Sequence, residues 1–130
     1  MSSEPRHRRT NETMSECISQ YPGELDLDAV GMFQIIPGGR VNFGLTGDDL
    51  TNYVRRAILA LLDAGAVPVR GAPGTDYFWV HQKHYGTSRE DIADAVIAEW
   101  LSLENDPMVL VGAAWFARPR PDSTDYVKMD

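Results

Sequence analysis

Two segments of the chain have apolar residues at the spacing of an amphipathic helix. In the first, they recur at every third or fourth position. This stripe consists of Leu50, Tyr53, Val54, Ala57, Ile58 and Leu61. Thr46 can cap its start, two aspartates follow where the helix dipole favours negative charge, and Gly65 can end it in the left-handed conformation. The pattern predicts a helix over residues 47–64 with one buried face.

The second segment begins with the spacing of a capping box and ends before a proline. Thr87 and Glu90 are spaced as such a box, and Ser88 and Asp91 have the same spacing but fit the motif less well. The apolar stripe that follows consists of Ile92, Val96, Trp100 and Leu103, flanked by Ala93 and Ile97. These signals predict a second helix, which ends before Pro107.

Four other segments are rich in β-branched, aromatic and other apolar residues and are predicted to be strands. They are residues 30–36, 66–70, 77–83 and 108–117. The turn signal at 37–40 contains proline and glycine, so residues 41–43 can return as a short hairpin arm. Pro68 has no amide hydrogen to donate, which places its strand at a sheet edge.

The order strand, helix, strand, strand, helix, strand is that of ferredoxin-like βαββαβ domains. In this α+β fold, two right-handed crossovers place both helices on one face of an antiparallel sheet. The strands at 30–36 and 77–83 are then central. The strands at 66–70 and 108–117 fall at the edges, where a proline is tolerated. An extra hairpin at 37–43 and a different strand order are the open alternatives.

The length of 130 residues fits one domain, which we expect to span residues 25–118. We expect residues 1–24 to be a flexible polar leader and residues 119–130 a polar tail. The sequence leaves open whether Met1 or Met14 is the start.

The composition narrows the classes of partner. The net charge of −7 argues against nucleic acids and anionic membranes, and it favours basic proteins or small molecules. Cys17 is the single cysteine, so no internal disulfide can form. No apolar run reaches membrane-spanning length and no secretory signal is present, so we expect a cytoplasmic protein.

The strand at 77–83 supplies a candidate contact surface. Alternation places Tyr77, Trp79 and His81 on one face, which we expect to be the open face, and Trp115 can join them there. A slip of one residue would exchange the faces, so the sequence leaves open which face is buried. Asp94 and Glu99 make the second helix acidic and suit it to docking a basic partner.

Catalytic and metal-binding motifs are weak in this sequence. His81 can act as a general acid or base near Asp76, but a surface histidine is the plainer interpretation. His81 and His84 point to opposite faces of a strand and have no obvious third ligand, so we predict neither a metal nor a cofactor.

These observations favour a small cytoplasmic protein-binding or regulatory module without catalysis of its own. An immunity-type neutraliser of a basic protein suits the size and charge. One alternative is a small-molecule-binding protein or small enzyme that uses His81 on the open sheet face; another is a structural subunit of an assembly. An exposed edge at 108–117 would also pair two copies into a homodimer.

Overall fold

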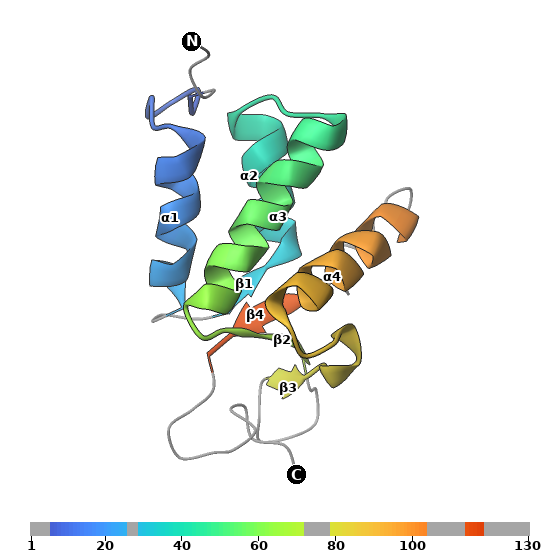
Figure 1. The fold of residues 1–130 in the computed structure, drawn as a ribbon. Helices are drawn as coiled ribbons and strands as arrows, with labels where there is room; N and C mark the ends of the chain where they lie inside the picture. The colour runs from blue at the N-terminus through green and yellow to red at the C-terminus, as the bar shows by residue number, and fades with distance from the viewer. Residues whose placement is uncertain (1–5, 26–28, 72–78, 104–113, 119–130) are drawn as a thin grey trace.

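Four helices and a small antiparallel sheet form the described part of the computed structural model, which covers residues 6–25, 29–71, 79–103 and 114–118 (Figure 1). The helices are α1 (Met14–Glu24), α2 (Met32–Asn42), α3 (Gly47–Asp63) and α4 (Arg89–Leu103), and a 3-10 turn, η1 (Lys83–Tyr85), precedes α4. The strands are β1 (Val30–Gly31), β2 (Val67–Gly71), β3 (Trp79–His81) and β4 (Trp115–Ala117). Their order in the sheet is β1-β4-β2-β3, with every neighbouring pair antiparallel.

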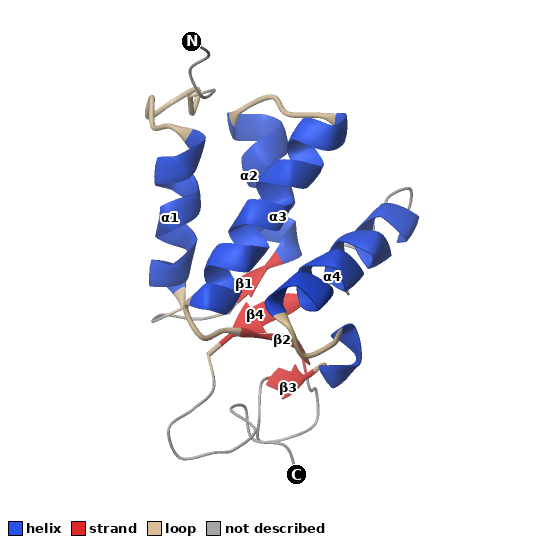
Figure 2. Ribbon diagram, in the orientation of Figure 1, coloured by secondary structure: helices blue, strands red, loops and turns tan. Residues whose placement is uncertain are grey.

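Helix α3 lies at the centre and contacts each of the other three helices (Figure 2). Its predicted apolar stripe is buried, and its bounds match the prediction to within one residue. The predicted stripe of α4 is also buried from Ile92 to Trp100. Its cap is Ser88, whose Oγ accepts the Asp91 amide at 3.1 Å, so the weaker of the two predicted pairs starts this helix.

The prediction of a strand over residues 30–36 is wrong beyond Gly31, because the chain there turns into α2. The first turn of α2 is held by the Gln34 side chain, whose Oε1 accepts the Gly31 amide at 2.8 Å. Pro37 lies inside the helix on its exposed side. The turn predicted at 37–40 is therefore the middle of a helix.

Two glycines that read as turn residues bring α2 close to its neighbours. A Cβ on Gly39 would lie 2.7 Å from Tyr53 Cδ1, and a Cβ on Gly38 would lie 2.6 Å from Tyr21 Oη. These distances leave no room for a side chain, so the glycines allow tight helix packing. Close approach explains both glycines better than a turn does.

The ferredoxin-like fold is also wrong, because the helices are too many and the strand order is different. β4 and β2, expected at the edges, are interior, while β1 and β3, expected in the centre, are the edges. Val30 and Phe116 join the main helical core from one face of the sheet. Val69 is fully buried within a second cluster, together with Ala29 and Ala117.

Pro68 is tolerated in an interior strand because of where its nitrogen points. Its carbonyl accepts the Gln82 amide at 2.8 Å, on the side of β3. The nitrogen and carbonyl of one strand residue face the same neighbour, so the missing donor also faces that side. Gln82 lies beyond the last residue of β3, so the proline interrupts none of the β2–β4 pairing.

Part of the segment assigned from sequence to a flexible leader is a helix packed on the core. Helix α1 buries Ile18 and contacts α3. Thr13 and Glu16 form a capping box, with amide-to-side-chain distances of 3.1 Å and 3.0 Å. The tail at 119–130 lies outside the described residues. No helix within the described ranges is both long enough and apolar enough to cross a membrane.

Candidate functional site

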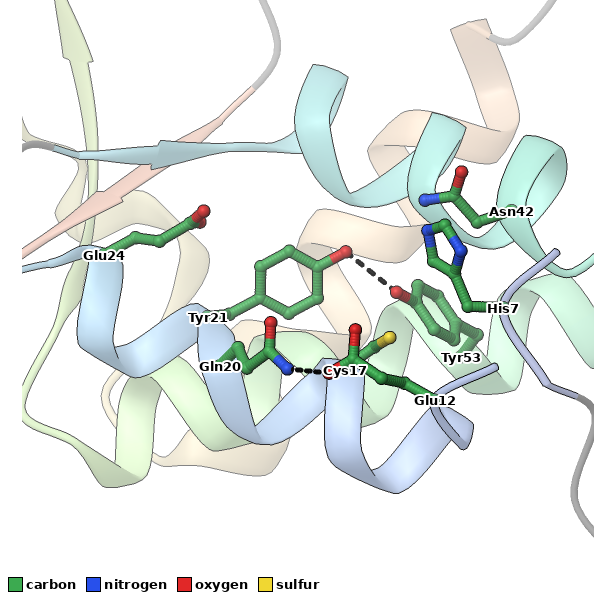
Figure 3. Close-up of a pocket in the computed structure, with 8 residues that line it drawn as sticks. All are labelled: His7, Glu12, Cys17, Gln20, Tyr21, Glu24, Asn42 and Tyr53. Carbon is green, nitrogen blue, oxygen red and sulfur yellow. Dashed lines mark hydrogen bonds between the residues drawn. The ribbon is translucent and has the colours of Figure 1, made fainter. Parts of the chain in front are cut away.

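A polar cavity of about 160 Å³ lies between α1, α3 and the segment that precedes α1 (Figure 3). It is lined by His7, Glu12, Cys17, Gln20, Tyr21, Glu24, Asn42 and Tyr53. Helix α1 contributes four of these residues, and the end of α2 contributes Asn42.

The segment 6–13 forms one wall of the cavity because hydrogen bonds fix it in place. The Arg8 amide donates to the Asn42 carbonyl at 3.0 Å, and the His7 amide donates to the Glu12 carbonyl at 2.7 Å. The His7 ring packs edge-on against Phe43, with 5.8 Å between ring centroids. Its Nδ1 accepts two backbone amides, at 3.0 and 3.2 Å, so a neutral His7 carries its proton on Nε2.

Tyr21 and Tyr53 join their hydroxyl groups at the centre of the site. The two oxygens are 2.8 Å apart, and the rings meet edge to face, as Figure 3 shows. Burial raises the pKa of Tyr21, and its hydrogen bond to Tyr53 raises this pKa further. Burial also raises the pKa of Tyr53, although its hydrogen bond with Tyr21 opposes that shift. Both phenols are therefore neutral near pH 7.

Cys17 lies beside the tyrosines as a protonated thiol. Burial raises the pKa of this thiol, and the nearby carboxylates of Glu12 and Glu16 raise it further. Since the thiolate is the nucleophilic form, this environment works against nucleophilic chemistry at Cys17.

The two carboxylates of the cavity, Glu12 and Glu24, differ in their hydrogen bonds. Glu12 accepts hydrogen bonds from Thr10 Oγ1 at 2.8 Å and from the side-chain amide of Gln20. Within the described part of the chain, neither Glu24 nor the side-chain amide of Asn42 has a hydrogen-bond partner. These two groups are free to meet a ligand.

The arrangement is suited to binding. The described residues contain no group of three or more His, Cys, Asp or Glu that could hold a metal ion. Small-molecule pockets are typically about 300–1,000 Å³. A volume of 160 Å³ corresponds to about five water molecules, which is room for one side-chain-sized group.

Of the predicted site residues, none whose side chain the structure describes lines this cavity. Tyr77 lies outside the described residues, as does Asp76. Trp79 and His81 lie on β3, where only the backbone is described, with His81 opposite Val69. Trp115 lies on β4, where its indole covers Gly31.

The two predicted acidic residues of α4 are engaged within the fold. Asp94 forms an ion pair with Arg55 of α3. Glu99 accepts a hydrogen bond from the Tyr85 hydroxyl at 2.7 Å. Docking through these two carboxylates would compete with existing contacts.

The described ranges carry no net charge, because they contain ten acidic and ten basic residues. The net charge of −7 therefore comes from the rest of the sequence. Within the described part, the cavity is lined by two carboxylates and by no lysine or arginine.

The sequence did contain a signal for α1. Met14, Cys17, Ile18 and Tyr21 follow helical spacing. Thr13 and Glu16 have the spacing of a capping box at the start of this helix. The polar composition indicated a flexible leader instead, and Pro22-Gly23 is typical of a turn.

No protein-family model matches the chain, and searches of curated proteins and of solved structures found no match.

Proposed function

We propose that the chain is a small cytoplasmic regulatory module that binds a basic partner protein and has no catalysis of its own. An immunity-type neutraliser of that partner is the most specific form of this proposal. The observation that carries it is the cavity, which is small, polar and lined by two carboxylates. One side chain of a partner fits there, whereas a cofactor or a drug-sized substrate does not.

The protonation states of the cavity favour binding over catalysis. A nucleophile needs a lowered pKa or an adjacent base, whereas the pKa values of Cys17, Tyr21 and Tyr53 are all raised. A small enzyme built on His81 would need side chains outside the described part of the chain.

Nucleic acid is a poor fit, although α2 and α3 are joined by a four-residue turn as in helix-turn-helix motifs. Asp48 and Asp49 occupy the first turn of α3 and are exposed. They would repel phosphates where such a motif meets DNA.

A homodimer through residues 108–117 is not part of the proposal. The described residues of that strand, 115–117, pair with β1 on one side and β2 on the other. No edge is left there for a second copy to extend the sheet.

Blocking the cavity tests the proposal. Gln20→Trp places a large ring at the cavity, and Ser19→Trp makes the same change at an exposed neighbour on α1 that does not line it. We expect the tagged wild type to retain one basic protein stoichiometrically from native lysate. High salt should weaken this complex, because opposite charges hold it. Quantitative mass spectrometry should show its loss with Gln20→Trp and its retention with Ser19→Trp.

The proposal fails if no partner is retained stoichiometrically, or if both tryptophan variants retain it equally. Thermal unfolding of both variants checks that each remains folded.

A further inference from the structure

We propose that the cavity is a socket for the guanidinium group of an arginine side chain on the partner. This inference rests on the proposed function, because it specifies which partner group enters the site.

The fixed charges around the cavity favour a cation. Glu12 and Glu24 line it, and none of the eight lining residues is a lysine or an arginine. Glu16 adds a third carboxylate near Cys17, while the opposing cation near Tyr53 is Arg56, whose guanidinium also donates to Ser15 Oγ at 2.8 Å. An anionic ligand would face two carboxylates that form no ion pair with the described residues.

The cavity presents several acceptors to a ligand that donates hydrogen bonds, beside donors on His7, Cys17 and Asn42. Glu12 and Glu24 supply carboxylate oxygens, the Asn42 amide supplies a carbonyl oxygen, and the hydroxyl pair supplies oxygen lone pairs. These acceptors come from the segment before α1, from α1 itself, from α2 and from α3. Guanidinium presents five donors in a flat fork, so it can bind acceptors that lie close together, as the two phenol oxygens do at 2.8 Å.

The walls suit the rest of an arginine side chain. The Tyr21 and Tyr53 rings offer aromatic surface, against which a guanidinium gains cation–π attraction and its methylene groups can pack. The volume of 160 Å³ accommodates one such group and leaves no room for a second residue.

Titration of the full-length chain with blocked tripeptides, followed by two-dimensional NMR, tests the assignment. The probes are Gly-Arg-Gly, the same peptide with neutral citrulline in place of arginine, and Gly-Lys-Gly. We expect Gly-Arg-Gly to shift the amides of Cys17, Tyr21 and Tyr53 with saturable binding. We expect the citrulline peptide to bind at least roughly tenfold more weakly, because it loses the charge-assisted hydrogen bonds.

Two carboxylate variants locate the contact. Glu24→Gln removes a charge that has no partner among the described residues, so the fold should tolerate it, and we expect binding to weaken roughly tenfold. Asp49→Asn removes an exposed carboxylate outside the cavity and should leave binding unchanged. The assignment is overturned if arginine and citrulline peptides behave alike, if lysine binds more tightly than arginine, or if Glu24→Gln has no effect.

The two proposals fail in different ways. Retention of a partner that Gln20→Trp abolishes, without any response to arginine peptides, would overturn the guanidinium assignment and leave the proposed function standing. Free methylguanidinium that binds as tightly as the peptide, with no partner retained from lysate, would uphold the chemistry and overturn the proposed function.

Discussion

Gly39 lies so close to Tyr53 and Leu50 that its hydrogen atom fills the space a side chain would need. A Cβ there would lie 2.7 Å from Tyr53 Cδ1 and 2.9 Å from Leu50 Cδ1. Both neighbours are buried in the stripe of α3, so neither can move freely. The residue therefore sets how closely α2 packs on α3, and through Tyr53 it borders the cavity.

Replacing Gly39 by alanine should lower the free energy of unfolding by about 1–3 kcal/mol, because the added methyl group overpacks a filled contact. Gly23 is the matched control, since a Cβ there would meet nothing within 4 Å. Gly23→Ala should stabilise the protein by up to about 1 kcal/mol through helix propensity. Urea denaturation of both variants measures the difference. Equal effects would contradict the packing argument.

The tyrosine pair gives stability a dependence on alkaline pH. Burial raises the pKa of Tyr21 and of Tyr53 above the ordinary value of 10.0, so the folded state holds these protons more tightly than the unfolded state. The unfolded chain loses them first as the pH rises, and stability falls with pH wherever the folded state binds more protons. The contribution is therefore fully present below about pH 10 and declines above it.

We expect the free energy of unfolding to fall as the pH rises from about 10 to about 11, and the fall to be smaller in Tyr21→Phe. Urea denaturation across this range, with tyrosinate absorbance as a second readout, makes the comparison. Cys17→Ala should be measured alongside, because the pKa of this thiol is also raised. An identical slope in wild type and Tyr21→Phe would contradict the assignment to the pair.

At the scale of elements, the start of α4 shows how two overlapping signals are resolved. The sequence offers Thr87 with Glu90 and Ser88 with Asp91, and the structure uses Ser88. Ser88→Ala should lower the free energy of unfolding by about 1 kcal/mol, whereas Thr87→Ala should change it by less than about 0.5 kcal/mol. Thermal denaturation of the two variants measures this. The larger loss in Thr87→Ala would show that the other cap operates.

The helices that could be predicted are those whose local signals agree. In α3 and α4, apolar periodicity and termination signals coincide, so their buried faces were predictable. In α2, Pro37 and the two glycines indicate a turn, and only contacts with Tyr21 and Tyr53 from other helices explain them. Tertiary contacts override local preference there.

The cavity could not be derived from the sequence, because its walls come from segments far apart in the chain. Tyr21 and Tyr53 are 32 residues apart and meet only when α1 packs on α3. Tyr53 read correctly as a core residue, but nothing in its local sequence indicates a phenolic partner. A polar site between helices depends on how they pack, which periodicity does not encode.

At the scale of the whole molecule, local sequence predicted where the strands lie along the chain better than it predicted which strands pair in the sheet. The segments containing β2 and β3 were predicted as strands, yet the assignment of centre and edge was reversed throughout the sheet. The strands are short, so little sequence was available to fix their order. From the sequence alone, Pro68 indicates an edge strand. Its missing amide hydrogen faces Gln82, beyond the end of β3, so an interior strand can contain it.

The interior place of β4 has a consequence for the order of folding. β4 lies between β1 and β2, although it is the last of the described elements along the chain. Val30 pairs with Phe116, a contact between distant parts of the sequence that closes a long loop. The helical contacts around α3 close shorter loops and can form earlier. During synthesis on the ribosome, β1 and β2 therefore cannot pair with β4 until residues 115–117 emerge and insert between them.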